Sequence, residues 1–287
     1  MKKIKILLLS LILASLSLPT FGAASENAKK HDRKISVQAY TFRNNTLEEV
    51  LKILSELGVK YIECYPEQKL SDKYPNARVD WNLNAEQRAF LKKLMKDTGV
   101  QMKSYGCIMK SPRPVAELEA QVKNVCEFAA DMGVEQVQTE AKFCEIPMWL
   151  KYAKKHGLTI GVHHHAIDAY NNQYYRPEAL ADLVDRFKVQ ALCDTGHWAR
   201  SGLDPLKCLK YMRGKFKFGI HFKDLNTFGE VQNFKGVAYG TGVLNAKAML
   251  QELDNQGFDG YFIIENEQIY EDPVPVVKAC VEWLRNN

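Results

Sequence analysis

Short apolar runs alternate with longer amphipathic stretches from about residue 35 to the end of the chain. The short runs are rich in β-branched residues, and the longer stretches carry apolar positions at helical spacing. This alternation is typical of repeated strand–helix units around a parallel sheet. The expected strands lie near residues 35–40, 60–64, 100–105, 135–139, 158–163, 189–194, 217–222 and 260–265. Eight strands of this kind predict an α/β fold that closes into a single (β/α)8 barrel.

The boundaries of the expected helices carry their own signals. Thr46 and Glu49 form a capping-box pattern before an apolar-periodic segment that stops at Gly58. A second segment opens at Asn84 and stops at Gly99, and two more are expected over 114–133 and 147–157. The related phrases ELGV, DTGV, DMGV and KHGL each end a helix at glycine and enter the next strand. They behave as weak internal repeats of one structural unit.

The first 34 residues do not fit this pattern. Three lysines in the first five residues precede an apolar run over 6–18, which is followed by Pro19 and small residues at 22–24. This arrangement predicts a cleavable secretory signal over 1–24, a polar tail over 25–34 and the barrel over 35–287. The apolar run is shorter than the ~20 residues of a membrane span, so no stable membrane insertion is expected after cleavage. We therefore expect an exported protein, periplasmic or secreted.

Charge and cysteine content narrow the function classes. The formal net charge of +5 includes three lysines of the first 24 residues, which hold no acidic residue, so the mature chain would carry about +2. A nearly neutral chain without a basic stripe argues against a nucleic-acid partner. The seven cysteines are scattered singly, so no disulfide framework is predicted, and most are expected to be buried packing residues.

Four polar clusters close apolar runs in the second half of the chain: HHH at 163–165, DTGH at 194–197, HFKD at 221–224 and ENE at 265–267. The carboxyl ends of parallel strands meet at one face of a barrel, so side chains far apart in sequence converge there. Imidazoles and carboxylates brought together in this way are what a divalent metal needs. The clusters therefore predict a metal-dependent enzyme.

Alternation along the strands selects which side chains reach that face. With Ile160 and Val162 toward the helices, His163 and His165 point into the barrel, and His164 is expected to be structural. Similar reasoning on the three later strands gives one inward residue each. The predicted ligands of a single divalent ion are thus His163, Asp194, His221 and Glu265. Nitrogen donors make Mn²⁺, Zn²⁺, Co²⁺ or Fe²⁺ better candidates than Mg²⁺.

The remaining polar residues near the strand ends supply candidates for catalysis and substrate binding. Catalytic roles are expected for Glu265, His165, His197 and Lys223. Substrate contacts are expected from His165, His197, Lys223, Glu63 and Glu140, the last two at the ends of earlier strands. The segment GVAYGTG at 236–242 could offer backbone N–H groups to an anion, although a plain loop is the expected structure.

At these residues the chain resembles the sugar isomerase and epimerase superfamily of xylose-isomerase-like TIM barrels, which also contains endonuclease IV. The resemblance rests on LCDTGHWARSG at 192–202, GIHFKD at 219–224, GTG at 240–242 and GYFIIENE at 260–267. It implies a metal between a fifth-strand glutamate, Asp194, His221 and Glu265. The chain departs from the pattern on the fifth strand, where His163 stands in place of the glutamate.

This departure bears on the reaction that the resemblance implies. Ketose epimerases of the family are thought to use two opposed glutamates as acid and base, and here only Glu265 remains of that pair. An elimination removes a proton next to a metal-polarised carbonyl and then expels a neighbouring group. It does not need two opposed glutamates. Barrels similar to this one include enzymes that cleave 3-keto-glycosides by such an elimination.

Three functions therefore stay open. The first is a lyase that eliminates the aglycone from a non-phosphorylated 3-keto-glycoside, and this is the preferred hypothesis. The second is a sugar isomerase or epimerase acting by 1,2-proton transfer. The third is a catalytically degenerate sugar-binding protein. The expected partner is a small carbohydrate, and a homo-oligomer is possible.

Overall fold

Eight parallel strands form a closed barrel in the computed structural model, which describes residues 32–107, 114–169, 173–268 and 271–287. They are β1 (Lys34–Gln38), β2 (Tyr61–Cys64), β5 (Gln101–Cys107), β6 (Gln136–Thr139), β7 (Thr159–His163), β8 (Gln190–Asp194), β9 (Gly219–Phe222) and β10 (Tyr261–Ile264). The strands are neighbours in this order, and β10 pairs with β1 to close the barrel. The expected single (β/α)8 barrel is confirmed. Residues 1–24 lie outside the described residues, so the signal peptide stays a prediction.

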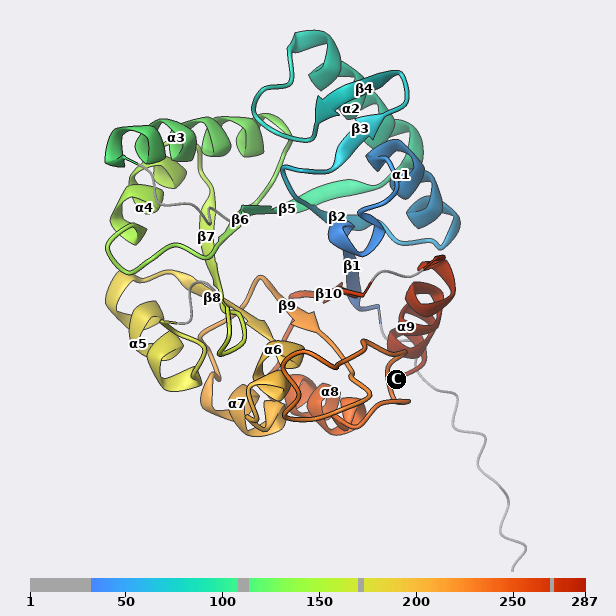
Figure 1. The fold of residues 1–287 in the computed structure, drawn as a ribbon, viewed down its shortest axis with the longest axis vertical. Coiled ribbons are helices and arrows are strands. Elements are labelled where there is room, and N and C mark those ends of the chain that lie inside the picture. Colours follow the sequence, from blue (N-terminus) through green and yellow to red (C-terminus); the bar gives the residue numbers. More distant parts are fainter. Residues whose placement is uncertain (1–31, 108–113, 170–172, 269–270) are drawn as a thin grey trace, which may run out of the picture.

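Helices surround the strands as an outer ring (Figure 1). The ring contains α1 (Leu47–Glu56), α2 (Ala85–Thr98), α3 (Val115–Asp131), α4 (Ile146–Lys155), α5 (Pro177–Phe187), α7 (Pro205–Tyr211), α8 (Ala246–Asn255) and α9 (Val274–Asn286). Two short helices, η1 (Ala39–Phe42) and α6 (Thr195–Arg200), follow directly on the ends of β1 and β8. Among the described residues, no helix has both the length and the apolar character to cross a membrane.

Two departures from the expected boundaries lie near the amino-terminal end. The first strand begins at Lys34, one residue inside the segment expected to be polar tail. A two-stranded antiparallel sheet of β3 (Lys69–Ser71) and β4 (Tyr74–Arg78) stands between β2 and α2, outside the barrel (Figure 1).

The helix boundaries follow the sequence signals. The Thr46 side chain accepts a hydrogen bond from the backbone N–H of Glu49, and the Glu49 carboxylate accepts one from the Thr46 N–H. Asn84 and Gln87 make the same reciprocal pair at the start of α2, which ends at Gly99 with a φ of 69°. These contacts satisfy N–H groups that have no partner within a helix. The capping box predicted at Thr46 is therefore confirmed, and the helix expected to open at Asn84 is capped in the same way.

The barrel has an apolar outside and a largely polar inside. Ile160 and Val162 pack in the main core beneath the helices, as the alternation predicted. Inside the barrel, β7 presents Gly161, and a Cβ atom there would lie 1.9 Å from Oε1 of Gln138 and 2.6 Å from Oε1 of Gln136. Any larger residue at 161 would require these two glutamine side chains to shift, because they fill the space beside the glycine. The buried polar residues inside the barrel lie next to the candidate functional residues at the strand ends.

Candidate active site

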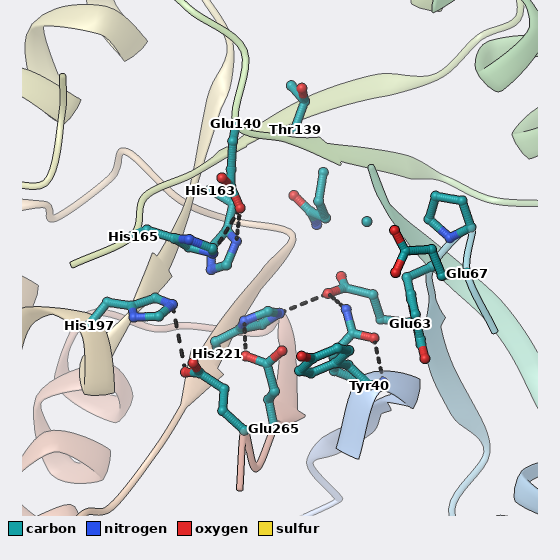
Figure 2. Close-up of a pocket in the computed structure, with 16 residues that line it drawn as sticks. Tyr40, Glu63, Glu67, Thr139, Glu140, His163, His165, His197, His221 and Glu265 are labelled. Atoms are coloured by element: carbon teal, nitrogen blue, oxygen red, sulfur yellow. Dashed lines mark hydrogen bonds and ion pairs between the residues drawn. The ribbon is translucent and has the colours of Figure 1, made fainter. Parts of the chain in front are cut away.

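A cavity of about 410 Å³ opens where the carboxyl ends of the strands meet. Its wall is built from residues at the ends of the barrel strands or in the segments that follow them, and most of these residues are polar (Figure 2). Of the residues expected to have a role, His163, His165, His197, His221, Glu63, Glu140 and Glu265 line it. Lys223 and Asp194 lie buried beside it. The structure thus brings all the predicted site residues into one region.

Three of these residues form a compact donor group. Asp194 Oδ2 lies 3.6 Å from His163 Nε2 and 3.4 Å from His221 Nδ1. All three atoms are buried, and in the described part of the chain none has a hydrogen-bond partner with suitable geometry. Two of them have charged neighbours, since Lys223 Nζ lies 2.9 Å from Asp194 Oδ2 and Glu265 Oε2 lies 3.1 Å from His221 Nδ1. Unsatisfied buried polar groups cost about 1–3 kcal/mol each, so they are retained where something else engages them. Two imidazoles and a carboxylate fit a divalent transition metal.

Glu265, the fourth predicted ligand, lies next to this donor group. Its Oε2 atom is 3.1 Å from His221 Nδ1 and 2.7 Å from Lys223 Nζ. Burial opposes ionisation, but the neighbouring Lys223 and His221 outweigh it and hold the pKa of Glu265 well below its usual range. A carboxylate that is this strongly stabilised in its charged form is a weak base for a carbon-bound proton.

Lys223 is the cation at the centre of the carboxylates. Its Nζ atom lies 2.9 Å from Asp194, 2.7 Å from Glu265 and 2.6 Å from Glu267. Burial alone would lower the pKa of this amine, but the three carboxylates raise it well above its usual value. Lys223 therefore stays charged beside the metal-binding group.

His165 and Glu140 form a pair on another side of the cavity. His165 Nε2 lies 2.8 Å from Glu140 Oε1, and His163 Nδ1 lies 3.9 Å from the same oxygen. Burial tends to lower the pKa of His165, but the Glu140 carboxylate reverses this and raises it. His165 lies outside the compact donor group, is partly exposed to the cavity and is backed by a carboxylate. Such an arrangement suits a general base.

Glu63 holds a metal-binding residue in place. Its Oε1 atom lies 2.8 Å from His221 Nε2 and accepts a hydrogen bond of 2.8 Å from Gln38 Nε2. A carboxylate on the remote nitrogen of a ligating histidine fixes the ring and its tautomer. The sequence suggested a substrate contact for Glu63; the structure places it at the cavity wall but engages it with His221. The part played by Gln38 was missed, since no sequence signal marks it.

His164 faces away from the cavity. Its ring is fully buried, stacks on Trp198 with 4.6 Å between centroids, and accepts a hydrogen bond of 2.9 Å at Nε2 from the Asp194 N–H. Burial lowers the pKa of His164 to about 3, so the ring is neutral and can accept this bond. The structural role expected for His164 agrees with this placement.

His197 extends from α6 toward the cavity, with Nε2 3.6 Å from Asp194 Oδ2. Burial holds the pKa of this ring well below its usual value. Its other nitrogen contacts Arg200, which in turn is paired with Glu267 at 3.1 Å. Sequence reasoning missed Arg200. The available signal was its spacing of three residues from His197, which places both side chains on one face of a helix.

The backbone N–H groups of the glycine-rich segment over 236–242 bind a carboxylate of the protein itself. The Asp224 carboxylate accepts hydrogen bonds from the N–H groups of Gly240, Gly242 and Leu244 at 2.9–3.1 Å. These N–H groups therefore hold the chain's own carboxylate, and the segment is the loop that was expected.

Comparisons with known proteins identify the family of the chain and solved structures with a similar fold. Residues 51–287 match the xylose isomerase-like TIM barrel family. Inosose dehydratase from Lacticaseibacillus casei is 30% identical over 129 residues, which cover 40% of this chain and 43% of that protein, so the match spans less than half of the relative. Similar folds include the IOLI protein with a bound zinc atom, at TM-score 0.69 and 18% identity, covering 87% of this chain and 95% of that one.

A further similar fold is the apo form of 3-keto-D-glucoside 4-epimerase from E. coli. The TM-score is 0.64 at 15% identity, and the match covers 88% of this chain and 99% of that one. These identities establish the shared architecture alone. The family match covers most of the chain, including every strand from β2 onward and all the residues of the donor group. The chain therefore belongs to the xylose isomerase-like TIM barrel family.

Proposed function

We propose that this protein is a metal-dependent lyase that eliminates an oxygen substituent from a six-membered keto-sugar, with a 3-keto-glycoside as substrate and its aglycone as leaving group. The observation that carries the proposal is the group of three buried donors, His163, Asp194 and His221, whose ligand atoms lie within 4.8 Å of one another, beside a histidine–carboxylate pair. A divalent ion held there would supply Lewis-acid polarisation of the substrate carbonyl.

The chemistry requires one base and one route for the leaving oxygen. The base removes the proton from C2, next to the C3 ketone, and the electron pair forms the C1–C2 double bond as the C1–O bond breaks. The departing oxygen takes up a proton and leaves as the alcohol, so the overall reaction consumes no co-reactant. Loss of water from a cyclic keto-polyol follows the same sequence, with hydroxyl in place of the aglycone.

The residues divide naturally between these tasks. His165, backed by Glu140 at 2.8 Å, takes the C2 proton and can return it to the leaving oxygen. Glu265, the other base considered from the sequence, is less suitable because it is paired with Lys223 at 2.7 Å. The charged Lys223 and the neighbouring His197 stabilise negative charge as the C–O bond breaks.

The comparisons support an elimination without naming the substrate. The name inosose dehydratase describes loss of water from an inosose, which is a cyclic keto-polyol, and that chemistry parallels loss of an aglycone. Export of the protein, expected from residues 1–24, also belongs to the proposal, since non-phosphorylated glycosides are available outside the cytoplasm.

An epimerase is the second candidate, and one observation favours it. Glu140 and His165 provide a proton-transfer group that is separate from Glu265 (Figure 2). Two such groups are what exchange of a proton between the two faces of a carbon requires. Deuterium incorporation from D₂O into a keto-sugar, with no group lost, would indicate this function.

The test is an assay of the purified mature protein with Mn²⁺, Zn²⁺ or Co²⁺ and a chromogenic 3-keto-glucoside. The proposal expects metal-dependent release of the aglycone together with an unsaturated keto-sugar. An inosose in a parallel reaction distinguishes water from an aglycone as the preferred leaving group. Absence of any elimination product with all three metals would contradict the proposal. If sugar binding without turnover also survives Asp194→Ala, the degenerate binding protein becomes the better description.

A further inference from the structure

Arg200 and His197 lie three residues apart on α6 and meet at the edge of the cavity. Arg200 Nη1 is 3.1 Å from His197 Nδ1 and 3.1 Å from Glu267 Oε2. A guanidinium group carries donors alone and stays protonated, and this nitrogen has two hydrogens for two neighbours. His197 Nδ1 must therefore be the acceptor, with its lone pair directed at Arg200.

The surroundings of Arg200 keep it in this position. Its Nη2 atom donates to the Val231 carbonyl at 3.2 Å, and the guanidinium carbon lies 3.9 Å from the centroid of the Phe234 ring. The side chain is 11% exposed. Contacts on both terminal guanidinium nitrogens, Nη1 and Nη2, and on the flat face of the group oppose any rotation away from His197.

We propose that Arg200 is a positioning residue that fixes His197 as the neutral tautomer with its proton on Nε2. The ring then presents an N–H donor to the cavity from a position 3.6 Å from Asp194 Oδ2. A neutral imidazole of this kind is a hydrogen-bond donor to a substrate oxygen, and it does not act as a proton donor. The identity of that oxygen rests on the proposed function, while the tautomer does not.

The same tautomer decides between two possible metal positions. Ligand atoms of His163, Asp194 and His221 lie within 4.8 Å of one another, and so do those of His163, His165 and His197. A metal needs a nitrogen lone pair, but His197 has one lone pair and Arg200 occupies it. The three-imidazole group therefore lacks a ligand, and the protein should bind one ion, in the group that contains Asp194.

Long-range ¹H–¹⁵N spectra of the zinc-loaded mature protein, labelled at histidine nitrogen, test the tautomer directly. The His197 signals are assigned by comparison with His197→Gln. We expect an unprotonated Nδ1 and a protonated Nε2, and one zinc per chain by mass spectrometry under native conditions. A proton on Nδ1, a doubly protonated ring or two zinc ions per chain would overturn the proposal. None of these measurements requires turnover, so failure of the lyase assay would leave them interpretable.

Variants at position 200 test the role of the arginine. Arg200→Lys keeps an obligate donor and should preserve the tautomer, whereas Arg200→Met should let protonated Nδ1 appear. Once a substrate is turned over, kcat of Arg200→Met should fall about tenfold to hundredfold with a smaller change in KM, and lysine should restore most of it. Arg43→Met is the matched control, because Arg43 contacts the Glu267 carbonyl at the same rim and does not contact His197. An unchanged His197 spectrum in Arg200→Met would contradict the assignment.

Discussion

His164 Nε2 accepts a hydrogen bond of 2.9 Å from the backbone N–H of Asp194, so a residue that faces away from the cavity positions the carboxylate of the donor group. Replacement of His164 by leucine would leave this buried N–H without a partner. We expect a loss of about 1–3 kcal/mol of stability and weaker zinc binding. Thermal unfolding and calorimetric zinc titration measure both effects.

The control for this substitution is His156→Leu, because His156 lies at the carboxyl end of α4, away from the cavity. This variant should keep the zinc affinity of the unmodified protein. If His164→Leu and His156→Leu bind zinc equally well, the bond between His164 and Asp194 does not support the metal site.

Substitutions in the cavity should distinguish the residues that bind the metal from the residue that acts as the catalytic base. His163→Ala and Asp194→Asn remove members of the donor group and should abolish high-affinity zinc binding. His165→Ala removes the base outside that group, so zinc binding should persist while elimination falls about a hundredfold or more. Isothermal titration with zinc and the aglycone-release assay measure the two properties. Loss of zinc binding in His165→Ala would instead assign this residue to the metal.

Gly161 should be intolerant of any side chain. A methyl group at 161 would collide with the side chains of Gln138 and Gln136, and relief of such overpacking typically costs about 1–3 kcal/mol. Gly106 on β5 is the matched control, since a Cβ atom there would meet its nearest neighbour at 3.4 Å, an ordinary contact distance. Chemical denaturation of Gly161→Ala and Gly106→Ala compares the two. Equal stability would show that the glutamine side chains can move aside.

The Asp224 carboxylate should hold its loop in place. Asp224→Ala removes the acceptor for four backbone N–H groups, of which those of Leu225 and Leu244 are buried. We expect a loss of more than about 2 kcal/mol, since each unsatisfied buried group costs about 1–3 kcal/mol. Asp224→Asn keeps one oxygen, so its stability should lie between that of Asp224→Ala and that of the unmodified protein. Hydrogen exchange at Gly240 and Gly242 reports the effect locally. Unchanged protection in Asp224→Ala would contradict this role.

The fold was largely predictable because its signals are local. Apolar runs marked the eight barrel strands to within one or two residues, and helix-capping pairs marked the starts of α1 and α2. The small β3–β4 sheet was not predicted, because its strands are short and partly exposed and carry no long apolar run.

Within the site, alternation along a strand correctly separated His163 and His165 from His164. It could not reveal contacts between strands, which depend on strand register and on the paths of loops. The engagement of Glu63 with His221, 158 positions apart in the chain, is one example. The pairing of Glu140 with His165 is another. The contact of Arg200 with His197 lies within α6, so its helical spacing was visible in the sequence even though the contact was missed.

The most direct test of the proposed metal site is anomalous diffraction from crystals grown with Mn²⁺ or Zn²⁺, recorded on both sides of the metal absorption edge. We predict one anomalous peak per chain, coordinated by His163 Nε2, Asp194 Oδ2 and His221 Nδ1. A peak coordinated by His165 and His197, or no peak in this cavity, would contradict it.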